Sequence, residues 1–155
     1  MAGFNTLLLE QEDGDLSDPI RCALSAVLEV GMIFSSHTHG NDVFYEAHMK
    51  SGDPRGEGAQ MVTLADQISQ RQLVGMLSRL LPDAKFISEE APDGHEDLLI
   101  RDVDVGAIGE IDLVFGIDPI DGTLQFRHKM WEWSISVGVM RKGVHVGGVI
   151  FAPDV

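Results

Sequence analysis

The feature that most constrains this chain is a mostly apolar stretch, residues 111–117, which leads directly into two aspartates, Asp118 and Asp121. An apolar run of this length is typical of a buried strand. Pro119 has no backbone N–H, so we expect the strand ladder to end there, and Gly122 permits a positive φ or the close approach of a ligand. The sequence therefore predicts a rigid bend at which the two carboxylates converge.

Two carboxylates at one point repel each other unless a positive charge lies between them. Oxygen ligands of this kind suit a hard divalent cation such as Mg²⁺, Ca²⁺ or Mn²⁺. The spacing alone does not separate a metal site from an ordinary turn, because Asp15 and Asp18 have the same spacing among other acidic residues. The position of Asp118 and Asp121 after a buried strand favours the metal site, and on the residues alone both interpretations stay open.

Composition limits the class of protein and its partners. The 155 residues, 44% of them hydrophobic, fit one domain with its own core. The formal net charge of −14 argues against nucleic acid and against an anionic membrane surface, and an anionic small substrate would need metal ions to offset this charge. Cys22 is the only cysteine, which is typical of a reducing compartment. We expect no apolar run long enough to span a membrane and no signal peptide, and therefore a cytoplasmic protein.

We expect a flexible acidic lead-in, residues 1–17, followed by one α+β domain over residues 18–155. The lead-in is rich in Asp and Glu and offers little apolar surface to bury. Asp18 and Pro19 form a helix start signal, with Asp as the cap and Pro at the first helical position. Apolar residues at helical spacing then predict an amphipathic helix over residues 19–36.

A second helix is predicted to follow Thr63, because Thr63 and Asp66 fit the capping-box pattern. It extends to about Leu81 and ends before Pro82, which cannot continue a helix. Asp66 has two interpretations: a cap that satisfies free N–H groups, which the spacing alone favours, or an acid that also points into a site. The predicted buried stripe of this helix is Leu73, Met76, Leu77 and Leu80.

Strands are predicted for much of the remaining chain. A short strand over residues 85–88 leads into Glu89 and Glu90. These two acids are either a plain surface pair, or a pair of which one points into a site and the other is solvated. Alternating apolar residues over 133–139, a turn at 141–143 and a further strand over 144–151 predict an antiparallel hairpin. Helices followed by several strands indicate an α+β fold, with an antiparallel sheet and two long helices packed on it.

Together, these motifs resemble the inositol monophosphatase family of metal-dependent phosphomonoesterases. The resemblance covers about residues 20–155 and implies the N-terminal half of that family's layered α-β-α-β-α fold. Ser88 is found where the family usually has glycine, and this substitution resembles the branch that acts on adenosine 3′,5′-bisphosphate. The motifs that carry the resemblance are, in order, Val62-Thr63-Leu64-Ala65-Asp66, Ser88-Glu89-Glu90 and Ile117-Asp118-Pro119-Ile120-Asp121-Gly122-Thr123.

The resemblance implies a set of metal ligands. Glu89 looks like the carboxylate that bridges two metal ions, and the resemblance implies a catalytic role for it as well. Asp118, Asp121 and the carbonyl of Ile120 look like further ligands. Mg²⁺ is the implied cofactor, as two or three ions, with Mn²⁺ as the alternative.

The resemblance also implies catalytic and substrate-binding residues. Thr123 and Asp66 look like the pair that orients and activates the attacking water, so that Asp66 is both a cap and a proton acceptor. Asp121 and the N–H groups of Gly122 and Thr123 are the expected contacts to the phosphate of the substrate. A helix that begins at Gly122 would strengthen these contacts.

The expected function is therefore hydrolysis of a small phosphorylated substrate by metal-activated water. The residues leave open whether this substrate is an inositol phosphate, a fructose bisphosphate, an adenosine bisphosphate or histidinol phosphate. Family members continue into a second α/β half with a further metal-binding aspartate, so the alternative is an incomplete N-terminal fragment that only binds metal or phosphate or acts as a regulatory module. Apolar surface that the second half would cover predicts a homodimer or other self-association.

Overall fold

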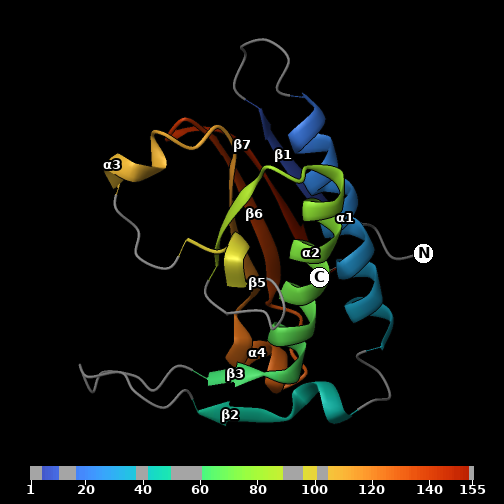
Figure 1. The fold of residues 1–155 in the computed structure, drawn as a ribbon. Coiled ribbons are helices and arrows are strands. Elements are labelled where there is room, and N and C mark those ends of the chain that lie inside the picture. Colours follow the sequence, from blue (N-terminus) through green and yellow to red (C-terminus); the bar gives the residue numbers. More distant parts are fainter. Residues whose placement is uncertain are drawn as a thin grey trace.

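The computed structural model describes residues 5–10, 17–37, 42–49, 61–88, 96–100 and 105–153. Over these residues the chain forms a five-stranded sheet with two long helices side by side on one face (Figure 1). This arrangement confirms the predicted α+β class. In the spatial order of the sheet, the strands are β1 (Asn5–Glu10), β7 (Val144–Ala152), β6 (Ser134–Arg141), β5 (Val114–Asp121) and β4 (Lys85–Ser88).

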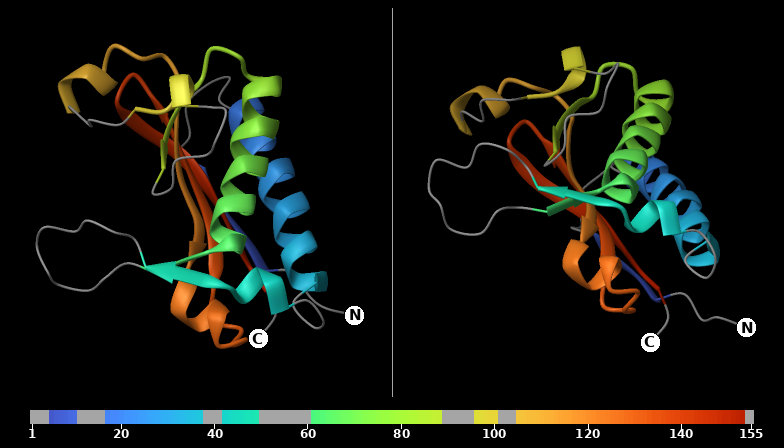
Figure 2. Two further views of the ribbon diagram at one scale, coloured as in Figure 1. Left: turned by 60° about the horizontal axis from the view of Figure 1, so that its bottom comes forward. Right: turned by 90° about the horizontal axis from the view of Figure 1, so that it is seen from below.

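The two long helices are α1 (Ser17–His37) and α2 (Leu64–Leu80), close to their predicted spans. Both cover the same face of the sheet, α1 over β6 and β7 and α2 over β5 (Figure 2). α1 comes so close to β7 that a Cβ atom added to Gly31 would lie 2.5 Å from the ring of Phe151. Glycine at this position therefore lets the helix backbone pack directly against an aromatic side chain.

The short elements gather mainly at the end of the sheet where α2 begins. There, the antiparallel pair β2 (Ala47–Met49) and β3 (Met61–Thr63) lies near α4 (Thr123–Arg127) (Figure 1). The remaining short elements are η1 (Asp42–Tyr45), η2 (Glu96–Leu98) and α3 (Val105–Ile108).

α1 is also long and apolar enough to cross a membrane by length and composition, over Pro19–Ser36 with a mean hydropathy of 1.3. This corrects the expectation that no segment of the chain reaches that length. In the structure one side of α1 packs on α2, β6 and β7, and Ala23, Val27 and Val30 are completely buried. A core helix that is partly covered in this way meets the same length and composition criteria as a membrane span.

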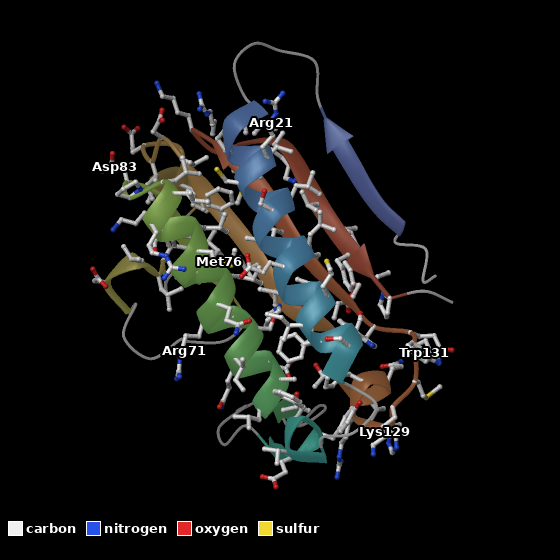
Figure 3. The ribbon with its side chains drawn as sticks, turned by 90° about the vertical axis from the view of Figure 1, so that its right-hand side faces the viewer. Arg21, Arg71, Met76, Asp83, Lys129 and Trp131 are labelled. Atoms are coloured by element: carbon white, nitrogen blue, oxygen red, sulfur yellow. The ribbon has the colours of Figure 1, made fainter. Side chains whose placement is uncertain are left out.

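The buried stripe of α2 differs from the prediction at its C-terminal end. Leu73 and Leu77 are completely buried, and Met76 lies on the side of α2 that faces α1 (Figure 3). Leu80, however, is 55% exposed. Leu81, the C-cap residue whose backbone is no longer helical, packs against the core instead.

The sheet is mixed, whereas the sequence predicted an antiparallel one. β4 pairs with β5 in parallel, with Ser88 opposite Ile117, and the other neighbouring strands are antiparallel. Parallel strands need a long connection, and residues 89–113 supply it. The parallel pairing places the carboxyl ends of β4 and β5 next to each other.

Part of the predicted lead-in, residues 1–17, forms a strand. Asn5–Glu10 forms strand β1, which pairs antiparallel with β7 from Asn5 opposite Ala152 to Glu10 opposite Gly147. Without β1, β7 would present the unpaired N–H and C=O groups of a sheet edge. The prediction rests on the acidic residues at positions 10–15 and gives no weight to the apolar run over residues 7–9, which lies in β1.

The hairpin of β6 and β7 confirms its prediction. Lys142 and Gly143 both have positive φ, 48° and 76°, which is the geometry of the two-residue turn that best matches the twist of the strands. The alternation of β6 is also confirmed, since Ile135, Val137 and Val139 are buried.

An aromatic cluster holds α4 against the rest of the core. Phe126 of α4 has its ring centroid 5.2 Å from that of Trp133 and 5.1 Å from that of Tyr45, and 6.3 Å from that of Phe34 on α1. Pairs of this kind add about 0.5–1.5 kcal/mol each beyond the burial of their area. The segment that follows the acidic bend is therefore fixed by packing on several elements.

Candidate functional site

The acidic bend lies at the carboxyl end of β5. Asp118 is opposite Ser136 and Asp121 is opposite Ser134, so three steps along β5 match two along β6. This register shift is a β-bulge. It contradicts the prediction that the ladder ends at Pro119, because the pairing is interrupted at the proline and resumes at Asp121. A bulge tolerates proline, since the ladder does not use an N–H there.

The bulge places both aspartates on one face of the sheet. Residues three apart in a regular strand point to opposite faces. Here the partners of Asp118 and Asp121 are two serines that are two residues apart and so share a face. Asp118 is half-buried and Asp121 is exposed. The extra residue thus brings the two carboxylates to the same side.

Gly122 turns the chain from β5 into α4. Its φ of 85° is in the left-handed region, which confirms the predicted positive φ and strongly favours glycine. A Cβ atom here would also lie 2.7 Å from the carbonyl oxygen of Glu132. α4 begins at Thr123, where the N–H of Phe126 donates to the carbonyl of Gly122 at 2.9 Å.

The structure brings together Thr123 and Asp66, which are 57 residues apart in the chain. The hydroxyl of Thr123 lies 3.2 Å from Oδ1 of Asp66 and 3.0 Å from the carbonyl oxygen of Ile120. Because a hydroxyl has one proton to donate, these two acceptors share it. The start of α2 is therefore linked directly to the acidic bend.

Asp66 uses its two carboxylate oxygens differently. Oδ2 accepts from the hydroxyl of Thr63 and from its N–H at 2.7 Å, and the N–H of Asp66 donates to the Thr63 hydroxyl at 3.4 Å, which completes the predicted capping box. Oδ1 faces Thr123. The two interpretations of Asp66 are thus geometrically compatible, because the cap occupies one oxygen and leaves the other for the bend.

Burial raises the pKa of Asp66 above its ordinary value of 3.8, and the hydrogen bonds from Thr63 and Thr123 oppose this shift. The side chain is only 3% exposed. Desolvation disfavours the charged carboxylate, so Asp66 accepts a proton more readily than an exposed aspartate does.

Two polar residues of the site were missed by the sequence analysis. The hydroxyl of Ser69 donates to the carbonyl of Pro119 at 3.0 Å, and the hydroxyl of Ser88 donates to Oε1 of Gln70. Ser69 and Gln70 are both completely buried. The available signal was their spacing, because they follow Asp66 by three and four positions and so lie on the buried face of α2.

The described part of the bend offers oxygen donors, from Asp118, Asp121 and the carbonyl of Ile120. Such donors fit a hard cation such as Mg²⁺ or Mn²⁺, and burial of the Asp118 Oδ1 atom favours a nearby positive charge. Among the described residues, no group of three His, Cys, Asp or Glu side chains is placed to hold a metal. Glu89 and Glu90 lie outside the described residues, so the metal-ligand assignments stay predictions.

Comparison with known sequences gives the family. The sequence profile of the inositol monophosphatase family matches residues 15–155. The inositol-1-monophosphatase of Synechocystis is 27% identical over 101 residues, which are 64% of this chain and 30% of that protein. The 3′(2′),5′-bisphosphate nucleotidase of Escherichia coli is 29% identical over 92 residues, 59% of this chain and 33% of that protein. The chain thus spans about a third of the length of these curated relatives.

Solved structures agree with the sequence profile. An inositol monophosphatase from Thermotoga maritima has a TM-score of 0.63 and 25% identity, over 86% of this chain and 43% of that one. An inositol monophosphatase/NADP phosphatase in complex with NADP and Ca²⁺ has a TM-score of 0.64 at 16% identity, over 90% of this chain and 45% of that one. The predicted family is confirmed: the chain belongs to the inositol monophosphatase family.

Proposed function

We propose that this chain carries the metal-binding and proton-accepting part of a divalent-metal-dependent phosphomonoesterase. The observation that carries the proposal is the 3.2 Å contact between the Thr123 hydroxyl and Asp66 Oδ1. It links a buried proton acceptor to a bend whose two aspartates share a face of the sheet. Family membership supports a phosphatase.

The contacts of Asp66 define a route for one proton. A water molecule that donates its proton to the Thr123 hydroxyl allows that hydroxyl to pass its own proton to Asp66. Oδ2 already accepts two hydrogen bonds from Thr63, so Oδ1, which faces Thr123, takes the proton. The raised pKa of Asp66 favours this transfer.

Asp118, Asp121, the Ile120 carbonyl and Glu89 are the proposed metal ligands. When bound, Mg²⁺ or Mn²⁺ would lower the pKa of a water molecule and neutralise charge on the phosphate. The chain's net charge of −14 repels an anionic substrate, so the substrate depends on this positive charge. The relative crystallised with Ca²⁺ supports a divalent ion in this fold.

The proposed substrate is a phosphate monoester of a small polyol, sugar or nucleotide. The two curated relatives described above act on inositol phosphate and on nucleotide bisphosphate by name. An open pocket of about 350 Å³ adjoins Asp121 and Gly122 and is bordered by Trp131 and Trp133. Its position beside the proposed phosphate contacts suits the organic part of such a substrate.

A cytoplasmic location remains part of this proposal.

A second candidate function is a metal- or phosphate-binding module without turnover. It needs only the oxygen donors of the bend and the N–H groups of Gly122 and Thr123, and not the contact between Thr123 and Asp66. Self-association remains a prediction, and the exposed apolar side chains around α4 support it. These are Leu124, Met130 and Trp131, which are 53%, 47% and 45% exposed; Trp131 lies at the α4 end of the molecule in Figure 3.

The two functions are separated by measuring phosphate release by the 155-residue chain with Mg²⁺. The substrates are inositol phosphate, fructose bisphosphate and adenosine bisphosphate, and the variants are Asp66→Asn and Thr123→Val, with Thr123→Ser as a control that keeps the hydroxyl. We expect metal-dependent release that falls about 10²–10⁴-fold in Asp66→Asn, the range for loss of a general base. Thr123→Val should lose activity and Thr123→Ser should keep most of it.

Release that survives a chelator, or that is unchanged in Asp66→Asn, contradicts the phosphatase proposal. Binding of Mg²⁺ by titration with no release from any of the three substrates favours the binding module instead.

A further inference from the structure

The buried face of α2 is polar over its first two turns. Asp66, Ser69 and Gln70 are 3%, 0% and 0% exposed. Buried polar groups cost free energy unless they form hydrogen bonds, and each of these reaches a different element. Asp66 contacts Thr123 at the start of α4, Ser69 contacts Pro119 in the bend of β5, and Gln70 contacts Ser88 at the end of β4.

Ser69 acts on the centre of the bulge. Its hydroxyl lies 3.0 Å from the carbonyl oxygen of Pro119, which is 50 residues away in the chain. Pro119 is one of the residues that the register shift leaves without a β6 partner. The bond from α2 therefore fixes the peptide group between Pro119 and Ile120, which adjoins two proposed metal ligands, Asp118 and the Ile120 carbonyl.

Gln70 acts on the neighbouring strand. Its Oε1 atom accepts from the hydroxyl of Ser88, the last residue of β4. Ser88 is opposite Ile117 in the parallel pair, and Ile117 immediately precedes Asp118. The bond from Gln70 thus ties the carboxyl end of β4 to the same helix that holds the bend of β5.

We propose that Ser69 and Gln70 are positioning residues, which hold the carboxyl ends of β5 and β4 in the geometry that binds the divalent ion. This inference rests on the proposed function, because it assumes that the bend binds metal. Apolar side chains would fill the same space, but only a hydrogen bond fixes the direction of the Pro119 carbonyl. Both residues are completely buried, so they act through the backbone segments that they anchor.

The experiment is a calorimetric titration of the 155-residue chain with Mn²⁺, which measures the Kd. It is done at a temperature where circular dichroism shows every variant to be folded. The variants are Ser69→Ala, Gln70→Met and Ser88→Ala. Ser78→Ala is the matched control, because it removes a hydroxyl from the same helix that bonds only to Gly75 of that helix. Ser88→Thr keeps the hydroxyl that Gln70 accepts.

We expect Ser69→Ala to weaken the Kd for Mn²⁺ by about threefold or more, as loss of one directing hydrogen bond allows, and Ser78→Ala to leave it unchanged. Ser88→Ala should weaken binding and Ser88→Thr should restore it. Because Gln70 and Ser88 act through one bond, the Gln70→Met/Ser88→Ala double variant should lose no more affinity than the larger single effect. If Ser69→Ala does not fold, the comparison of Ser88→Ala with Ser88→Thr tests the same inference.

Variants that lower the thermal midpoint but leave the Kd at its wild-type value overturn the inference, since that result describes a structural role only. Titration of Asp118→Asn separates a failure of this inference from a failure of the proposed function. If Asp118→Asn abolishes binding while Ser69→Ala and Ser88→Ala do not change it, the inference alone fails. If the wild type and Asp118→Asn give the same heats, the proposed metal site fails and the inference with it.

Discussion

The two halves of α2 present the same face to the sheet but different chemistry. In the N-terminal half this face carries Asp66, Ser69 and Gln70, whose polar atoms bond to segments 18–57 residues away in the chain. In the C-terminal half it carries Leu73, Val74 and Leu77, which are completely buried in the core. One half therefore bonds to the segments that form the site, and the other half packs apolar side chains into the core.

The largest effect on stability is expected from the apolar half. Leu77→Ala removes a completely buried side chain, and we expect it to lower the free energy of unfolding by about 2–5 kcal/mol. Urea unfolding followed by circular dichroism measures this loss. Among molecules that remain folded, Mn²⁺ affinity should stay at the wild-type value. A large loss of affinity would mean that the two halves are not separate in their roles.

A smaller effect is expected at the start of the polar half. Thr63→Ala removes the side chain that caps α2 and bonds to Asp66 Oδ2, and we expect a loss of about 0.5–2 kcal/mol in the free energy of unfolding. Thr63→Ser keeps the hydroxyl and should lose much less. Equal losses in the two variants would show that the methyl group, and not the cap, is responsible.

Because Asp66 is ionisable, we expect the stabilising contribution of the polar half of α2 to depend on pH. Burial raises the pKa of Asp66 in the folded chain above the ordinary value of 3.8, which is its value in the unfolded chain. At a pH between these two pKa values, the folded chain therefore binds more protons than the unfolded chain. The stabilising contribution of Asp66 is therefore complete below pH 3.8 and is lost as the pH rises through the raised pKa. Asn cannot titrate.

Urea unfolding in a chelator tests this sign. The unfolding free energy of the wild type, relative to Asp66→Asn, should fall as the pH rises through that interval. A relative gain in stability with rising pH would mean that hydrogen bonding outweighs burial and that the folded pKa is depressed.

The smallest effect is expected at Leu80, which the helical pattern assigned to the buried stripe but which is 55% exposed. Leu80→Ala should change the free energy of unfolding by no more than about 0.5 kcal/mol, as for most surface substitutions. Measured beside Leu77→Ala, it shows where the apolar half of α2 ends. A loss of several kcal/mol at Leu80 would restore the stripe that the sequence predicted.

The features predicted correctly are those decided by neighbouring residues. The capping box at Thr63 and Asp66, the positive φ of Gly122 and the alternation of β6 depend on local conformation and on periods of a few residues. The family also follows from short motifs, and the comparisons confirm it.

The features that were missed depend on partners distant in the chain. The pairing of β1 with β7, the parallel pairing of β4 with β5 and the bulge at Pro119 are set by backbone bonds between strands. The helical spacing from Asp66 places Ser69 on the buried face of α2, but its partner, Pro119, is 50 positions away, and no local pattern names that partner. The role of Glu89 stays a prediction, because Glu89 lies outside the described residues.

The claim that the acidic bend binds a divalent cation is tested most directly by an anomalous difference map from crystals of this chain soaked in Mn²⁺. We expect a peak next to Asp118, Asp121 and the Ile120 carbonyl, with its height strongly reduced in Asp118→Asn crystals. A wild-type map without a peak at the bend at saturating Mn²⁺, or an unchanged peak in Asp118→Asn, would contradict the claim.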